Sequence, residues 1–373
     1  MTARRRGYVL VVTIDAAAAP TVLFFGELAR VRPTDVRIAQ YRRDPIATLL
    51  GGASAVIFVR GLFEFGELVS AAAAFGMPRY YFLDDNFVLI CEQGGEAARF
   101  VTQYSESNMR TALAGFAGVL LATEPLIEDF RRRGLHSRLH LFPPTAIAAV
   151  PQADRPGCRI AFFGGAHLRD VFGRIVLPAI RRFARDRDVA LVAVGIEDAI
   201  EPSRGLRIER WPYHSSYLEG VRALAAAGVT VIVHPSAAGL ANNAFKNPHA
   251  LITANAVGAV PIVSNTAPYD GLGGVALLCR HSEEDWHRAL VEAADPQRVG
   301  AMRERLASYC TSAFGGARNR AMVDEMLSLG APPPMVVVLR SAVVMSYLVR
   351  AQIRRVVNRC RRLMSGGAAT AIL

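Results

Sequence analysis

Short runs of β-branched and aromatic residues alternate with longer helical patterns along most of this chain. The first 145 residues contain six such runs: YVLVVTI, VRIAQY, AVIFVR, RYYFLDD, GVLLAT and RLHLFP. Runs that are apolar throughout are typical of parallel strands covered by helices on both faces. This part of the chain is therefore predicted to form one doubly wound α/β domain.

The pattern restarts after PPTAIAAVPQADRPG, a stretch rich in proline and small residues. Five further runs follow it: CRIAFFGG, VALVAVG, LRIERWP, VTVIVHPS and AVPIVSN, with a helix expected from about Asp170 to Arg187. We predict an N-terminal Rossmann-like domain over 1–145, a linker over 146–157 and a second Rossmann-like domain over 158–330. Two such domains in tandem place the carboxyl ends of two parallel sheets across a cleft, where such sheets bind ligands.

The last segment, 331–373, follows a different pattern, because seven arginines and no acidic residue occur after Glu325. Apolar residues fall on one face at helical spacing: Met345, Val349, Ile353, Val356, Val357, Cys360, Leu363 and Met364. Arginines fall on the other: Arg350, Arg354, Arg355, Arg359, Arg361 and Arg362. The apolar run before them is interrupted by Arg340 and is expected to be too short to span a bilayer. Two interpretations stay open: a basic amphipathic helix that lies on an anionic membrane through 335–364, or a terminal helix packed on the protein.

Composition agrees with a globular protein, since 52% of the 373 residues are hydrophobic and 20% are charged. The net charge is +11, but seven positive charges lie in the last segment and the aromatic residues are not interleaved with a basic stripe, so nucleic-acid binding is not expected. The five cysteines are far apart, which favours a reduced compartment and argues against a zinc site. The N-terminus resembles a signal peptide, but a first buried strand explains it better, and the expected location is the cytoplasm or the inner face of the cell membrane.

Lys246 is the single lysine among 43 basic residues. It lies in a polar loop that begins after His234 and passes through Asn243, just before a helix expected to start near Pro248. A compact ammonium beside a helix N-terminus can follow a phosphate as charge moves onto it. The alternative is one surviving lysine on a surface loop.

A glycine pair, Gly164 and Gly165, marks the turn after the first strand of the second domain. Glycines there let backbone N–H groups approach a phosphate, and His167 and Arg169 would add cations for a diphosphate. The alternatives are a tight turn and a surface position for His167. Tyr213, which follows a later strand, is a candidate to stack on a nucleobase.

Two carboxylates, Asp84 and Asp85, end a strand of the first domain. At that position they would face the cleft, where they could orient hydroxyls or act as a base. They could equally cap the next segment, because aspartate is a good helix cap. Asp15, His136 and His140 are interpreted as structural.

The ordered string of these features resembles the GT-B glycosyltransferases, in particular the large nucleotide-sugar-dependent group of family 4, or group 1, type. The resemblance covers most of residues 8 to 320. In the first domain it rests on ASAVIFVR, AAAAFGMPRYYFLDDNF and LLATEPLIEDFRRRG. In the second it rests on RIAFFGGAHLRDVFGRIVLPAIRRFARDRDVALVAVG, RIERWPYHSSYLEGVRALAAAGVTVIVHPS and NNAFKNPHALITANAVGAVPIVSNTAPY.

The resemblance implies a metal-independent, hexosyltransferase-like enzyme with no cofactor beyond its nucleotide-sugar substrate. Lys246 and Arg169 would stabilise the departing diphosphate, and the acceptor would lie near Asp84 and Asp85. The donor would be held by Gly164, Gly165, His167, Tyr213, His234, Asn243, Thr253 and Asn255. The acceptor is expected to be a hydroxyl of a glycan or lipid-linked molecule, in cell-surface polysaccharide or glycolipid assembly.

One departure from the family pattern concerns the ribose. Relatives carry a glutamate on the helix before the Pro-bearing strand, where it binds ribose hydroxyls. Here Ala254 falls near that position, flanked by Thr253 and Asn255, and no acidic residue lies between Glu219 and Asp270. Thr253 or Asn255 could bind a ribose hydroxyl without charge. A catalytically silent GT-B protein, which binds nucleotide or scaffolds a partner enzyme, is the alternative.

Overall fold

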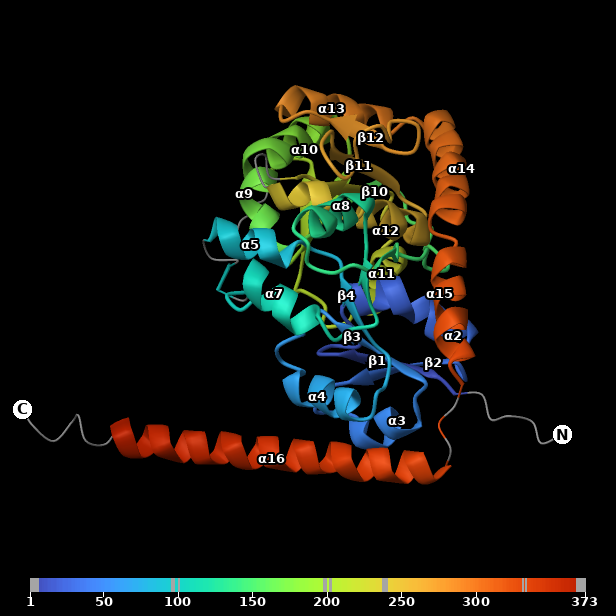
Figure 1. Cartoon of the computed structure of the whole chain (residues 1–373). Helices are drawn as coiled ribbons and strands as arrows, with labels where there is room; N and C mark the ends of the chain where they lie inside the picture. The colour runs from blue at the N-terminus through green and yellow to red at the C-terminus, as the bar shows by residue number, and fades with distance from the viewer. Residues whose placement is uncertain are drawn as a thin grey trace, which may run out of the picture.

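The computed structural model describes residues 7–94, 98–99, 101–196, 200, 203–236, 241–330, 332 and 334–366. It contains two six-stranded sheets, each parallel throughout and covered by helices. The sheets belong to two α/β units stacked one above the other, with a long helix beneath the lower one (Figure 1). The predicted architecture of two Rossmann-like domains is therefore confirmed.

The first sheet is formed by the six runs predicted in the first 145 residues. Its strands are β1 (Val9–Thr13), β2 (Val36–Gln40), β3 (Ala55–Val59), β4 (Arg79–Leu83), β5 (Gly118–Leu121) and β6 (Leu139–Leu141). The strand order is β2-β1-β3-β4-β5-β6. All residues of β1 are buried, as expected for a strand in the middle of a doubly wound sheet.

The second sheet has the order β12-β11-β10-β7-β8-β9. Its strands are β7 (Cys158–Phe162), β8 (Val189–Val194), β9 (Leu206–Trp211), β10 (Val231–His234), β11 (Val260–Ser264) and β12 (Leu277–Cys279). Five were predicted, and the sequence analysis missed the short edge strand β12. Successive strands are added on one side of β7 up to β9 and on its other side from β10 onward, and such sheets bind ligands at this switch point between β7 and β10.

Helices fill the connections between the strands. Those of the first unit are α1 (Ala19–Thr21), which continues through a π-helical turn (Val22–Gly26) into α2 (Glu27–Val31), then α3 (Ile46–Gly52), α4 (Gly66–Ala74), α5 (Phe87–Gln93), α7 (Glu106–Leu113) and α8 (Glu124–Arg132). In the second unit, α9 (Arg169–Val171), a π-helical turn (Phe172–Val176), α10 (Leu177–Phe183) and a final 3-10 turn (Ala184–Asp186) form the helix predicted from about Asp170 to Arg187. The others are α11 (Tyr217–Ala226), α12 (His249–Val257) and α13 (Glu283–Glu292).

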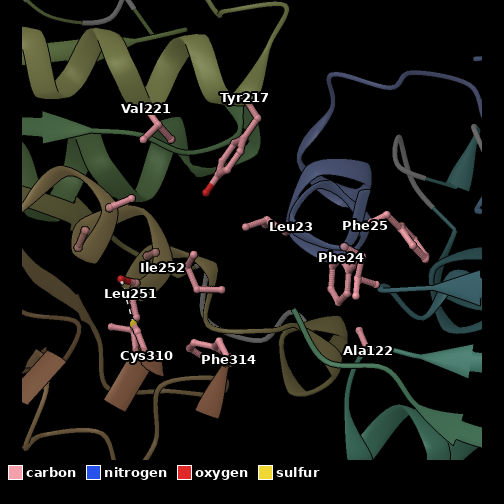
Figure 2. Packing of buried hydrophobic residues seen from close by; sticks show 14 of the residues in the cluster. Leu23, Phe24, Phe25, Ala122, Tyr217, Val221, Leu251, Ile252, Cys310 and Phe314 are labelled. Atoms are coloured by element: carbon pink, nitrogen blue, oxygen red, sulfur yellow. Dashed lines mark hydrogen bonds between the residues drawn. The ribbon is translucent and has the colours of Figure 1, made fainter. Parts of the chain in front are cut away.

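The two units share an apolar core. Figure 2 shows Leu23, Phe24, Phe25 and Ala122 of the first unit and, from the second, Tyr217, Val221, Leu251, Ile252, Cys310 and Phe314. All ten belong to one cluster of buried residues. Backbone hydrogen bonds reinforce the contact, including one from the Tyr217 N–H to the Ala17 carbonyl at 3.0 Å. Because this contact is apolar and buried, it fixes the arrangement of the two sheets.

Two helices carry the chain back from the second unit to the first. α14 (Pro296–Ala313) packs on α12, whereas α15 (Ala317–Ser328) contacts β1. Asp324 of α15 forms an ion pair with Arg32 at 2.6 Å, and the Asn319 amide donates to the Pro143 carbonyl at 2.8 Å. The predicted domain limits remain predictions, although α15 returns to the first sheet before residue 330.

The C-terminal segment forms one long helix, α16 (Pro334–Gly366), which packs on α3 and α4 (Figure 1). The expectation that the apolar run is too short to span a bilayer was wrong, because the helix continues through Arg340 and beyond it. Met335–Asn358, with a mean hydropathy of 1.5, is long and apolar enough to cross a membrane by length and composition alone. The side chains predicted to face opposite sides beyond Asn358, including those of Cys360 and Arg361, lie outside the described residues.

Candidate active site

A cavity of about 270 Å³ lies between the two units, at the switch point between β7 and β10 of the second sheet. Eight of the predicted site residues line it: Asp84, Asp85, Gly165, His167, Tyr213, His234, Asn243 and Lys246. Side chains that the sequence analysis did not select also line it, among them Arg60, Asn247, His249 and Tyr269. The cavity therefore lies where the sequence analysis predicted a ligand site, at the carboxyl ends of the parallel strands.

Lys246 lies where a short 3-10 helix, η6 (Ala241–Phe245), meets the start of α12. The helix begins at His249 with Pro248 as its N-cap, one residue later than predicted. No ion pair joins Lys246 to a carboxylate among the described residues, although its charge helps to lower the pKa of Asp85. A half-buried ammonium beside a helix N-terminus is an electrostatic arrangement suited to a diphosphate.

The glycine turn after β7 also lines the cavity, through Gly165. A Cβ on Gly165 would come within 2.6 Å of the His167 ring, and one on Gly164 would come within 3.5 Å of His234 Nδ1. The absence of side chains at both positions therefore lets the two imidazoles approach the turn. Arg169 is exposed at the start of α9 and does not line the cavity, so the structure does not bring it together with Lys246.

Two histidines stack edge to face at the base of the cavity. The ring centroids of His234 and His249 are 4.8 Å apart, and His234 Nδ1 is buried without a hydrogen-bond partner among the described residues. Burial, and then the charge of Lys246, lower the pKa of His249 to about 4, and burial lowers the pKa of both His234 and His167. At neutral pH the His234 and His249 rings are therefore uncharged and able to act as hydrogen-bond donors.

Asp84 and Asp85 both form ion pairs with Arg60, so the two carboxylates predicted to face the cleft are paired with a guanidinium. Arg60 Nε and Nη2 lie 2.5 and 2.8 Å from the two Asp84 oxygens, and Nη2 lies 2.7 Å from Asp85 Oδ2. Burial would raise the pKa of Asp85, but Arg60, Lys246 and Asn242 outweigh it and hold this pKa below its usual value. Arg60 has a φ of 59°, in the left-handed region that few non-glycine residues adopt. The three residues thus form a rigid charged floor for the cavity.

Asn242 connects this floor to the lysine loop. Its side chain accepts a hydrogen bond from the Asn86 N–H at 2.9 Å and donates one to Asp85 Oδ1 at 3.1 Å. A third bond runs from Thr123 Oγ1 to the Phe245 carbonyl at 3.0 Å. The 3-10 helix that precedes Lys246 is therefore held by the first unit at Asn242 and at Phe245.

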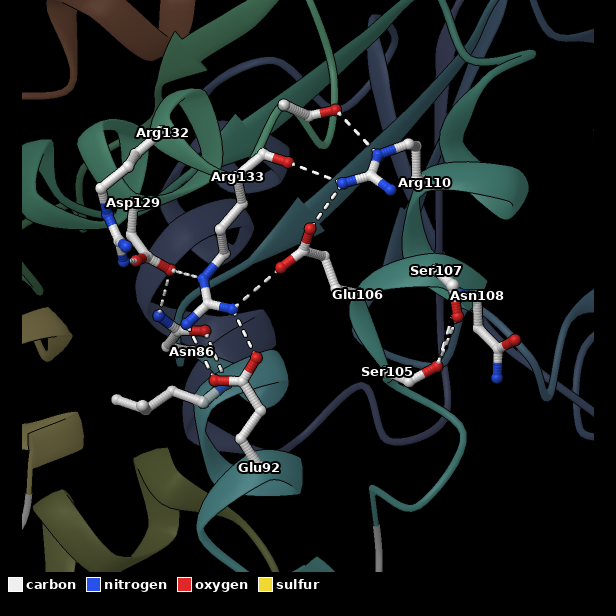
Figure 3. A network of polar contacts seen from close by, with 12 residues as sticks. Asn86, Glu92, Ser105, Glu106, Ser107, Asn108, Arg110, Asp129, Arg132 and Arg133 are labelled. Carbon is white, nitrogen blue, oxygen red and sulfur yellow. Dashed lines mark hydrogen bonds and ion pairs between the residues drawn. The ribbon is translucent and has the colours of Figure 1, made fainter.

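Asn86 is itself held by a polar network (Figure 3). Its amide donates to Asp129 Oδ2 at 2.8 Å, and its side-chain oxygen caps α5 by accepting from Leu89 N–H at 3.0 Å. Asp129 in turn pairs with Arg133, which also pairs with Glu92 and Glu106. Asn86 is fully buried, so this network fixes its position against Asn242.

The remaining predicted donor residues differ in position. Tyr213 is 67% exposed at the rim of the cavity, where a base could stack on its ring. Thr253 does not face the cavity: it is buried, and its hydroxyl lies 2.6 Å from the Tyr217 hydroxyl. Asn255 is half-buried near the far end of α12 and does not line the cavity either. The predicted ribose contacts from Thr253 and Asn255 thus find no support in this geometry.

A second cavity, of about 940 Å³, adjoins the first on the side of the N-terminal unit. The two share Pro20, Arg60 and His167. The walls of the larger cavity are mainly apolar: Ile14, Val59, Phe87, Ile90, Val101 and Tyr104. Asp15 and Glu64 add two carboxylates at its edge. A molecule held there would lie next to the cavity that Lys246 lines.

The sequence signal for the missed residues was weak. Arg60 is one arginine among many, and His249 stands alone in its segment, so only the fold shows that each lines the same cavity as Lys246. Among the described residues no group of three or more histidine, cysteine, aspartate or glutamate side chains could hold a metal ion.

No protein-family model matches the chain, and no curated protein matches it in sequence. Solved structures do match it. An alpha-glucosyltransferase, in complex with UDP and a 13-mer DNA containing a HMU base, is similar with a TM-score of 0.59 and 8% identity, over 87% of this chain and 100% of that chain.

Two further structures cover 87% of this chain each. An alpha,alpha-trehalose-phosphate synthase (UDP-forming) from Burkholderia vietnamiensis has a TM-score of 0.55 and 12% identity, over 99% of its own length. A sucrose-phosphate synthase from Thermosynechococcus elongatus has a TM-score of 0.55 and 11% identity, over 98% of its own length. The chain therefore has the GT-B fold of these glycosyltransferases, as its sequence motifs predicted.

Proposed function

We propose that this protein is a glycosyltransferase that moves a sugar from a nucleotide-sugar donor to a hydroxyl group of an acceptor. The observation that carries the proposal is the convergence of Lys246, the N-terminus of α12 and the Gly164–Gly165 turn on one cavity at the switch point of the second sheet. These groups form a binding site for a diphosphate. Tyr213 at the rim is placed to stack on the base.

In the proposed reaction the acceptor oxygen forms a bond to the anomeric carbon while the bond from that carbon to the phosphate oxygen breaks. Negative charge grows on the leaving nucleoside diphosphate, where Lys246 and the helix N-terminus stabilise it. Because a lysine of the protein stabilises this charge, we propose that transfer does not require a metal ion. Asp84 and Asp85 are committed to Arg60, and we propose that the leaving phosphate accepts the proton of the hydroxyl.

The larger cavity supports an acceptor with an apolar part. Its walls carry aliphatic and aromatic side chains, which suit a lipid-linked acceptor better than an extended polar glycan. We propose a role in the assembly of a glycolipid or a cell-surface polysaccharide, in the cytoplasm. The alpha-glucosyltransferase of similar fold was solved with DNA, but nucleic acid is not part of this proposal.

The second candidate is a silent protein that binds nucleotide without transferring sugar. It is favoured by one observation, namely that the region of α12 expected to bind ribose offers only the buried Ala254 and Thr253, the latter bonded to Tyr217. Labelled UDP-, GDP-, dTDP- and ADP-sugars, incubated with membrane lipid and glycan fractions, separate the two candidates. The enzyme transfers label to one fraction, and Lys246→Ala abolishes the transfer. Nucleotide binding without transfer to either fraction would establish the silent protein instead.

A further inference from the structure

The long helix α16 has one face that is already occupied by the protein. Val344 is fully buried against the first unit, and Arg340 Nη1 donates to the Ala53 carbonyl at 3.3 Å. At Gly51 of α3 the helices approach so closely that a Cβ would lie 2.9 Å from the Val337 carbonyl oxygen. The first turns of α16 are therefore docked on α3 and α4.

The opposite face is apolar and exposed. We call it the apolar stripe: Met335, Val338, Leu339, Met345, Val349, Ile353, Val356 and Val357, which are 42% to 74% exposed. At 100° per residue these positions occupy an arc of about 120°, centred nearly opposite Val344. An exposed apolar stripe of this length marks an interaction site.

Positive charge accompanies the apolar stripe. Arg350 and Arg354 are exposed and, by helical spacing, lie beside it. No acidic residue occurs after Glu325. An apolar stripe bordered by arginines and free of carboxylates complements a surface that is both apolar and negatively charged, which is the interface of an anionic lipid bilayer.

The position of α16 decides between the ways in which it could meet a membrane. It lies along the outside of the first unit, at the opposite end of the molecule from α13, and its C-terminal half extends beyond α4 (Figure 1). Crossing a bilayer would require the helix to leave α3 and α4 and to expose Val344. Pairing with a second copy would bring two arginine-bordered stripes together, which charge repulsion opposes. If α16 instead lies in the plane of the membrane interface, its contacts with α3 and α4 are kept.

We propose that the apolar stripe of α16 lies in the surface of an anionic membrane and holds the protein there with the first unit next to the lipid. This proposal goes beyond sugar transfer and does not depend on it. If both hold, the larger cavity, which belongs to the same unit, would operate near the bilayer.

Flotation of the full-length protein with lipid vesicles tests the proposal. Neutral phosphatidylcholine vesicles are compared with vesicles that also contain phosphatidylglycerol. The test variant is Val349→Glu with Ile353→Glu, and the matched control is Val291→Glu, at an exposed position of α13. All three side chains are exposed, so the fold should tolerate the changes, and the melting temperature checks this.

The wild type and the control are expected to float with anionic vesicles and to be released by alkaline carbonate. The partition coefficient of the double variant on anionic vesicles should be lower than that of the wild type by about tenfold or more. Absence of flotation, equal flotation of the double variant, or equal binding to neutral and anionic vesicles would overturn the proposal. So would resistance to carbonate, which indicates a spanning helix, or a dimer that the double variant dissociates while no vesicle binding occurs.

Discussion

At the scale of single residues, Thr253 is predicted to stabilise the fold without binding the donor. Its hydroxyl forms a buried hydrogen bond with the Tyr217 hydroxyl at 2.6 Å. Thr253→Val should lower the free energy of unfolding by about 1–3 kcal/mol, because the Tyr217 hydroxyl loses its partner, and should leave nucleotide affinity unchanged. Denaturant unfolding and calorimetry measure the two quantities. A loss of nucleotide affinity with an unchanged free energy of unfolding would instead indicate that Thr253 binds the ribose.

His249 is predicted to make stability depend on pH. Burial lowers its pKa to about 4 from an ordinary value of 6.5. Between pH 6.5 and about pH 4 this histidine is protonated in the unfolded chain but not in the folded protein. The free energy of unfolding therefore falls as the pH is lowered through this window. The melting temperature should fall across it less steeply in His249→Gln than in the wild type. Equal slopes would contradict this origin.

The residues of the site were predictable in part. Lys246 stood out because it is the only lysine, and Gly165, Tyr213 and His234 could be placed from strand ends. Arg60 could not, because nothing in a sequence rich in arginine distinguishes the one that pairs with Asp84 and Asp85. The two carboxylates at this strand end pair with that arginine, and their predicted role in orienting a hydroxyl or acting as a base stays a prediction.

At the scale of elements, the bridge from η6 to α5 is predicted to position the lysine loop. Asn242→Ala removes the bonds to Asn86 and Asp85. Nucleoside-diphosphate affinity should fall by about threefold to tenfold, equivalent to one or two net hydrogen bonds. Asn255→Ala, half-buried outside the cavity, is the matched control and should bind like the wild type. Equal affinities in both variants would show that the bridge does not position Lys246.

The docking of α16 on α3 is predicted to depend on Gly51. A Cβ there would lie 2.2 Å from Ser341 Oγ, so Gly51→Ala must displace α16 and should cost about 1–3 kcal/mol of unfolding free energy. Gly300→Ala, inside α14 with open space around it, is the control and should be neutral or stabilising by up to about 1 kcal/mol. Limited proteolysis should cut α16 faster only in Gly51→Ala. Identical digestion would show that the helix is not docked as described.

Most elements followed from hydrophobic pattern, because strands buried on both faces are apolar throughout. Eleven runs formed strands, whereas β12, with three residues at a sheet edge, was too short to recognise. Arg340 was interpreted as an interruption of an apolar run that was too short to span a bilayer. In the structure its guanidinium reaches the Ala53 carbonyl, so a helix can contain it without interruption.

At the scale of the whole molecule, the sequence predicted two domains that face each other across a cleft, but it did not predict the contacts that fix this arrangement. The arrangement depends on contacts between residues far apart in the chain, such as Leu23 and Phe24 with the cluster that contains Leu251 and Phe314 (Figure 2). Local pattern shows that these residues are buried but does not show against what. The cavity between the units exists because this shared core holds the two strand-end surfaces together.

The most direct test of the central claim is calorimetric titration of the protein with UDP, GDP, dTDP and ADP, repeated with Lys246→Ala. One diphosphate should bind, and the substitution should weaken it by about tenfold or more, or ~1.4 kcal/mol, as expected for a charge-assisted contact. Arg288→Ala, which removes an exposed positive charge on α13, should bind like the wild type. If no diphosphate binds, or if Lys246→Ala binds as tightly as the wild type, the cavity is not a nucleotide-sugar site.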